Sequence, residues 1–141
     1  MLFVHPSASE AGAPEPLGPF EHLRLEGAVL LFGGREIARL EEGRWKMMWN
    51  WLEERFSPPQ APPRQGDTWT TLKITPLAEL QFETGDRRSA GYGPFNEVTL
   101  AAANVEAAGR VLAQITDDGL HDANHARWSA LVITPSFSAH G

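Results

Sequence analysis

Two histidines four residues apart are the residues of this chain whose spacing could hold a metal ion. On a helix, His121 and His125 would project from one face, where a carboxylate could share the cation. The zinc-protease pattern has a glutamate directly after the first histidine, and the shorter Asp122 does not supply that general base. A polar stretch that contains Gly119 is more typical of a solvated turn. We therefore expect no metal and no cofactor, with His121 and His125 as the residues to examine.

Segment 85–95 is the part of the chain that most resembles a binding loop. It combines three glycines, the adjacent Arg87 and Arg88, and the only tyrosine, Tyr92. Its glycine spacing matches neither a P-loop nor a dinucleotide fingerprint. Arg87 and Arg88 could hold an anionic group, while Tyr92 and Phe95 could stack on a ligand or insert into a partner. The alternative is a long hairpin loop with solvated arginines.

Other catalytic patterns are missing from the sequence. No G-x-S-x-G elbow occurs, so a serine triad is not indicated, and the absence of cysteine removes thiol nucleophiles and thiolate metal sites. We predict no catalytic residues and favour a protein that is not an enzyme.

Composition and charge narrow the class of partner. The chain has 141 residues, 42% of them hydrophobic, which is ordinary for one globular domain. Its net charge of -6 and pI near 5.3 make a nucleic-acid partner unlikely, because duplex affinity depends on Lys and Arg. No apolar run approaches the roughly 20 residues that cross a bilayer, so we expect no membrane partner and a cytoplasmic location.

The first 19 residues predict an extended, proline-rich arm. Pro, Ala, Gly, Ser and Glu dominate this segment, and that composition suits neither a helix nor a central strand. We expect the arm to be held by its own domain or by a neighbouring subunit. Residues 20–141 would then form a single α+β domain, with two helices packed on a mostly antiparallel sheet of five to six strands.

The first predicted helix spans 44–56, where apolar side chains recur at a helical period. Its apolar arc covers roughly 200°, wider than the ~100° stripe that one sheet can bury. Met47 and Trp51 lie on the flank of this arc, so the arm, the following proline-rich linker or another subunit must cover them. Met47 and Trp51 are therefore predicted binding residues.

The second predicted helix spans about 97–116, because Val98, Val105 and Leu112 belong to an apolar series with spacings of three and four. One alternative keeps 97–102 as a strand and begins the helix at Asn104. Strands are expected near 21–26, 28–32 and 35–41, as an antiparallel meander, and again at 69–75 and 80–82.

The pattern W-[S/T]-x-L-x-I-T-P occurs twice, at 69–76 and at 128–135. One interpretation is a duplicated half-domain with pseudo-symmetry. The other is convergence of strands that begin with tryptophan and leave the sheet at a proline. In either case we expect both segments in one sheet, with Leu72, Ile74, Leu131 and Ile133 facing the same core.

These patterns favour a non-enzymatic interaction or assembly module, whose partner is another protein or further copies of this chain. The alternative is a small enzyme or anionic-ligand binder that uses the Arg87–Phe95 loop and the histidine pair. The enzyme hypothesis predicts that these two segments meet at one pocket with perturbed titration. The assembly hypothesis predicts exposed apolar area on the first helix and the arm.

Overall fold

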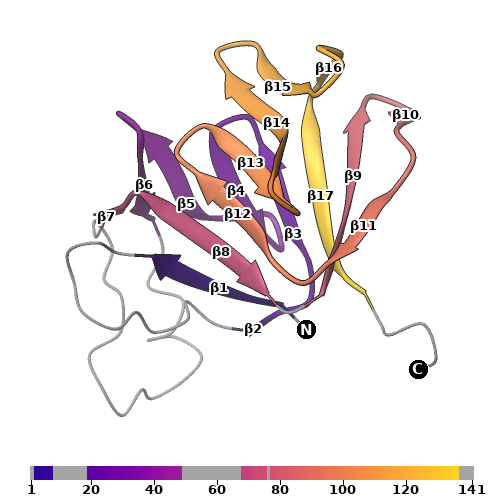
Figure 1. Ribbon diagram of the computed structural model, residues 1–141. Helices are drawn as coiled ribbons and strands as arrows, with labels where there is room; N and C mark the ends of the chain where they lie inside the picture. The colour runs from indigo at the N-terminus through magenta and orange to yellow at the C-terminus, as the bar shows by residue number, and fades with distance from the viewer. Residues whose placement is uncertain (1, 8–18, 49–67, 76, 137–141) are drawn as a thin grey trace.

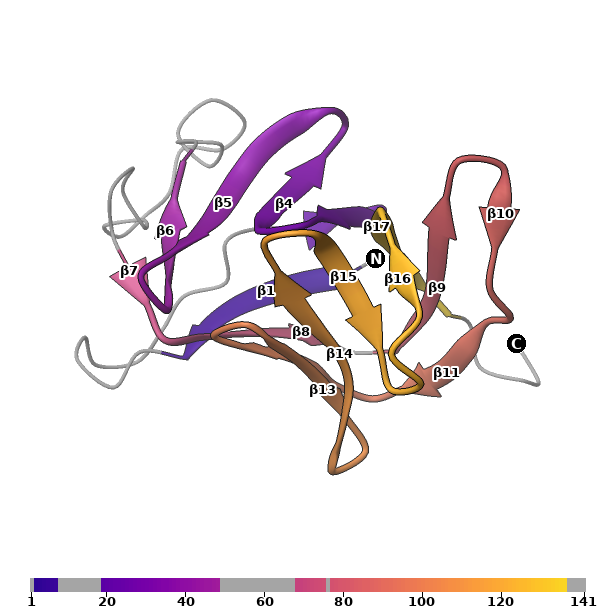
Figure 2. The ribbon, with the colours of Figure 1, turned by 90° about the horizontal axis from the view of Figure 1, so that it is seen from above.

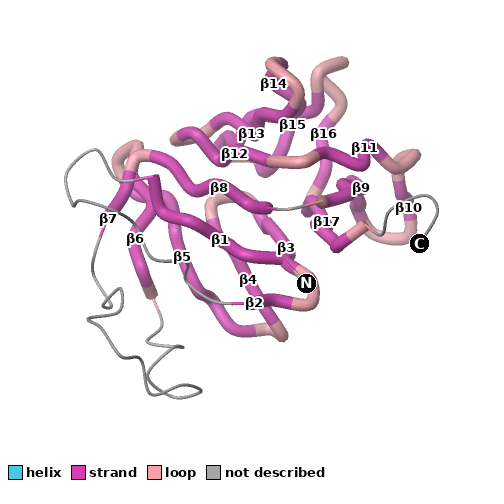
Figure 3. The backbone as a smooth tube through the Cα atoms, turned by 60° about the horizontal axis from the view of Figure 1, so that its bottom comes forward, coloured by secondary structure: helices cyan, strands magenta, loops and turns pink. Residues whose placement is uncertain are grey.

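The computed structural model describes residues 2–7, 19–48, 68–75 and 77–136, and within these residues every regular element is a β-strand (Figures 1 and 3). The strands form two antiparallel sheets that enclose one hydrophobic core. The predicted α+β class with two helices is therefore wrong. The described part of the chain contains no helix that is long and apolar enough to cross a membrane.

Sheet A has eight strands. Their spatial order is β16 (Arg127–Trp128), β15 (Gly119–Asp122), β14 (Arg110–Thr116), β13 (Asn104–Ala107), β12 (Val98–Ala101), β8 (Thr71–Thr75), β1 (Leu2–Ser7) and β2 (Pro19–Phe20).

Sheet B has nine strands. Their order is β10 (Arg87–Arg88), β9 (Ala78–Thr84), β17 (Ala130–Pro135), β3 (Leu23–Glu26), β4 (Val29–Phe32), β5 (Arg35–Glu41), β6 (Arg44–Met47) and β7 (Thr68–Trp69), and β11 (Tyr92–Phe95) also pairs with β9.

The chain contains an internal duplication. Strand β3 begins at Leu23 and β12 at Val98, 75 residues later, and the same interval separates β4 from β13, β5 from β14 and β6 from β15. The irregularity in strand pairing also repeats, after Leu30 in the first half and after Val105 in the second. Convergence of two short strings does not account for this correspondence, which supports the duplication interpretation.

The repeated W-[S/T]-x-L-x-I-T-P segments are where each half passes from one sheet to the other. Trp69 lies in sheet B and the following β8 in sheet A, whereas Trp128 lies in sheet A and the following β17 in sheet B. The expectation that both segments share a sheet is therefore wrong, although their leucines and isoleucines belong to one core. Each half thus closes the sheet of the other, with β8 paired to β12 and β17 paired to β3.

The core repeats with the strands, because alternate residues point inward along each strand. Leu25 and Leu100 occupy equivalent buried positions, as do Leu72 and Leu131. Their direct pairings, Leu25 with Leu131 and Leu72 with Leu100, lie where the two halves join. The fold therefore depends on contacts between halves as well as within them.

The segment predicted as the second helix is instead the hairpin series β12–β14. Its strands are joined by two-residue turns, which shift the buried positions so that spacings of two and five alternate. Sampled against a helical period, this series resembles spacings of three and four. The strand alternative for 97–102 agrees with β12, but no helix begins at Asn104, which is the first residue of β13.

The first predicted helix is also contradicted where it can be examined. Residues Arg44–Met47 form β6, with Trp45 and Met47 both buried on one face. Trp51 and the rest of that prediction lie outside the described residues. The two described ends of the proline-rich arm pair with each other, β1 with β2, and β1 also pairs with β8.

Candidate functional site

Four side chains from four strands form a continuous row in the second half. The ring of Tyr92, on β11, lies edge-on to Phe82 of β9, with 5.8 Å between centroids. Phe82 is also 5.8 Å from Trp128, which lies at the sheet crossing, and the Arg87 guanidinium lies 5.2 Å from the Trp128 ring centroid. Figure 2 shows β16 and β17 between the β14–β15 hairpin and β9. The row therefore links sheet B to the end of sheet A, and it ends in a cation over an aromatic face.

Asp122, the last residue of β15, fixes the position of Trp128. Its Oδ2 accepts a hydrogen bond of 2.9 Å from the Trp128 indole, and its Oδ1 accepts bonds from the backbone N–H groups of Asn124 and Ala126. Burial acts to raise the pKa of Asp122. The hydrogen bonds from Trp128, Ala126 and Asn124, together with nearby His125, outweigh burial and hold that pKa below its usual value. The ionised carboxylate is thus part of the folded structure.

A pocket of about 280 Å³ opens beside this row, and we call it the Tyr92 pocket. Phe82 and Tyr92 of sheet B line one side of it, Arg110, Val111 and Leu112 of β14 the other, and Ala123 and Asn124 come from the turn after β15. Val111 is 43% exposed, and it is the exposed large hydrophobic side chain among the described residues. The pocket has an apolar floor with one guanidinium at its edge.

The duplication supplies an internal reference for these residues. The position equivalent to Val111 in the first half is Glu36, whose carboxylate binds the Arg39 guanidinium at 2.6 Å. The position equivalent to Asp122 is Met47, which is buried in the core. Since the same strand accommodates a paired glutamate at one site, an exposed valine at the other is not required by the fold. Such departures indicate residues that serve another purpose.

Two further pockets show what the fold alone produces. One, of about 390 Å³, is lined by residues including Glu97, Glu106 and Gly109, and the other, of about 190 Å³, by residues including His22, Leu31 and Gly34. Their lining positions correspond across the 75-residue interval. Because the two halves share this depression while its side chains differ, we attribute it to the fold.

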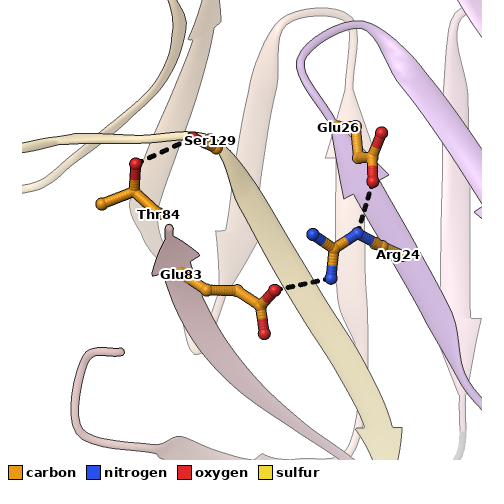
Figure 4. A network of polar contacts seen from close by, with 5 residues as sticks. All are labelled: Arg24, Glu26, Glu83, Thr84 and Ser129. Carbon is orange, nitrogen blue, oxygen red and sulfur yellow. Dashed lines mark hydrogen bonds and ion pairs between the residues drawn. The ribbon is translucent and has the colours of Figure 1, made fainter. Parts of the chain in front are cut away.

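The arginines of the two halves differ in their partners. Arg24 binds both Glu26 and Glu83 on the outer face of sheet B, as Figure 4 shows, and these bonds raise the pKa of Arg24. In the second half, exposed Arg110 and Arg127 form no ion pair within the part of the chain that the structure describes. Arg110 is the one of these two that lines the Tyr92 pocket.

The predicted binding residues are placed as follows. Arg87 and Tyr92 belong to the row. Arg88 is exposed on the edge strand β10, and because it follows Arg87 its side chain points to the opposite face. Phe95 is half-buried against the core, and Met47 is 2% exposed, so it is not at the surface. Trp51 lies outside the described residues.

The two histidines lie on a strand and a turn, so the helical spacing that made them metal candidates does not exist. His121 is half-buried in β15, and exposed His125 has a positive φ of 65° in the turn before β16. Within the described ranges, no three His, Asp or Glu side chains lie close enough together to hold a metal ion.

Sequence reasoning missed Phe82, Arg110, Val111, Asp122 and Trp128 as site residues. A signal was available: extending the W-[S/T]-x-L-x-I-T-P repeat backward aligns the halves and contrasts Val111 with Glu36. A scan against protein-family models, a search of curated proteins and a search of solved structures each returned no match.

Proposed function

We propose that this protein is a non-enzymatic interaction module that binds a protein partner, or further copies of itself, through the Tyr92 pocket and the adjoining row of Arg87, Trp128 and Phe82. The observation that carries the proposal is exposed Val111, which departs from its paired counterpart Glu36. Exposed apolar side chains beside arginine and aromatic rings are the composition of interface cores.

The chemistry of the pocket lining also supports this proposal. Its side chains offer apolar contact, one guanidinium, one phenol and one carboxamide. Guanidinium groups stay protonated in proteins, so Arg110 is suited to holding a partner's charge rather than to transferring a proton. We further infer a cytoplasmic location, with which the cysteine-free composition is consistent.

A second candidate, a binder of small anions, has one observation in its favour. Tyr92 from the Arg87–Phe95 loop and Asn124 from between the two histidines line the same pocket. This is the convergence expected for a ligand site, although the histidines themselves are not part of the lining.

Site-specific photo-cross-linking tests the main proposal. A benzophenone amino acid at position 111, in the full chain expressed in its own cells, should capture one discrete protein that mass spectrometry identifies. The same amino acid at position 36 is the matched control, because it occupies the equivalent place in the other half. Equal capture from both positions, or none from position 111 with a monomer in light scattering, would contradict the proposal.

A further inference from the structure

The size of the Tyr92 pocket limits what can enter it. Its volume of about 280 Å³ is at or below the lower end of the roughly 300–1,000 Å³ typical of small-molecule sites. Phe82, Tyr92, Val111 and Leu112 give it an apolar floor. A single large aliphatic side chain suits such a space better than a complete cofactor does.

The charge at the pocket edge limits what can lie beside that side chain. Arg110 is exposed and forms no ion pair with any described residue, although the chain carries six more acidic than basic residues. The nearby Asp122 carboxylate already accepts three hydrogen bonds. A guanidinium in this state matches a carboxylate in a two-bond geometry.

The net negative charge of the chain does not oppose this pairing. At physiological ionic strength the Debye length is about 8 Å, so charges elsewhere on the surface are largely screened and local groups decide the attraction. Arg110 at the pocket and Arg87 at the end of the row are the local cations.

We propose that the partner presents an acidic segment, in which one carboxylate pairs with Arg110 and a neighbouring aliphatic side chain enters the Tyr92 pocket. This inference rests on the proposed function and names the chemistry of the partner. The matching of the pocket's charge and its apolar floor to the segment is what favours this occupant over a second copy or a free anion.

The test uses the isotope-labelled full chain and a synthetic five-residue peptide with four carboxylate side chains around a central leucine. NMR titration should give saturable shifts at the Val111 methyl groups and at the Trp128 indole N–H. Arg110→Gln should weaken binding about tenfold, as expected for loss of a charge-assisted pair. Arg127→Gln, which removes an equally exposed and unpaired arginine outside the pocket, should change affinity less than about twofold.

Val111→Glu gives a second variant, because it installs the residue found at the equivalent position of the first half. It should abolish the peptide-induced shifts while the remaining spectrum stays folded. The inference is overturned if a peptide with glutamine in place of glutamate binds as well, if Arg127→Gln weakens binding as much as Arg110→Gln, or if citrate alone reproduces the Val111 shifts at the same concentration.

The two proposals fail in different ways. Capture of a partner at position 111 together with no peptide binding would overturn the acidic chemistry and leave the interaction module standing. Peptide binding without any captured partner would contradict the interaction proposal and favour the anion binder. Neither capture nor peptide binding would overturn both.

Discussion

At the scale of residues, the second half differs from the first by a few substitutions at equivalent positions. Glu36 corresponds to Val111, and Met47 corresponds to Asp122. Each change removes a feature that stabilises the first half, an ion pair or a buried side chain. The first creates an exposed apolar contact, and the second creates a carboxylate that orients Trp128.

Asp122→Asn should destabilise the protein by about 1–2 kcal/mol at neutral pH, because the carboxamide nitrogen would face an N–H donor at one of the three bonds. The pKa of Asp122 is lower in the folded chain than its usual value, so its ionised form contributes stability above the unfolded pKa of about 3.9. That contribution is lost as pH falls through the lower, folded pKa.

Urea denaturation of the wild type and of Asp122→Asn at pH 7 and near pH 3 measures this effect. The difference in free energy of unfolding should shrink at the lower pH. Asp118→Asn, in the exposed turn before β15, serves as the control and should differ little at either pH. A difference that stays constant with pH would show that the ionised carboxylate is not what holds Trp128.

At the scale of elements, hairpins with two-residue turns explain both the architecture and the errors of the sequence-based prediction. The meander expected at 21–41 is present as β3–β5, since Gly33–Gly34 is a recognisable hairpin turn. The equivalent turn of the second half is Ala108–Gly109, and Ala108 has φ of 53° where Gly33 has φ of 60°. Alanine is a strong helix former, so the same structure was concealed by helix-favouring composition.

This pair of turns makes a reciprocal prediction about stability. A Cβ at Gly33 would meet no atom within 4 Å, so only its positive φ opposes substitution. Gly33→Ala should therefore cost about 1 kcal/mol, and Ala108→Gly should gain about 0.5–1 kcal/mol. Thermal or urea unfolding of the two variants measures this, and changes of the same sign in both would contradict equivalent turn geometry.

At the scale of the whole molecule, the exchange of strands between halves lay beyond what the sequence could predict. Trp69 and Trp128 identify two equivalent segments, but local pattern does not say that a strand changes sheet one residue later. The Arg87–Phe95 loop was found because its composition is unusual. The residues that complete the site come from β9, β14 and β15, and only the folded chain brings them beside Tyr92.

The most direct test of the interaction proposal is the affinity of the purified, cross-linked partner for the wild type and for Val111→Glu, measured by calorimetry. We expect binding at least about tenfold weaker in the variant, because a charge replaces an apolar contact at the centre of the interface. Its thermal midpoint should be unchanged, since the equivalent strand accommodates Glu36. Equal affinity of the two proteins for the partner would contradict the assignment of this surface.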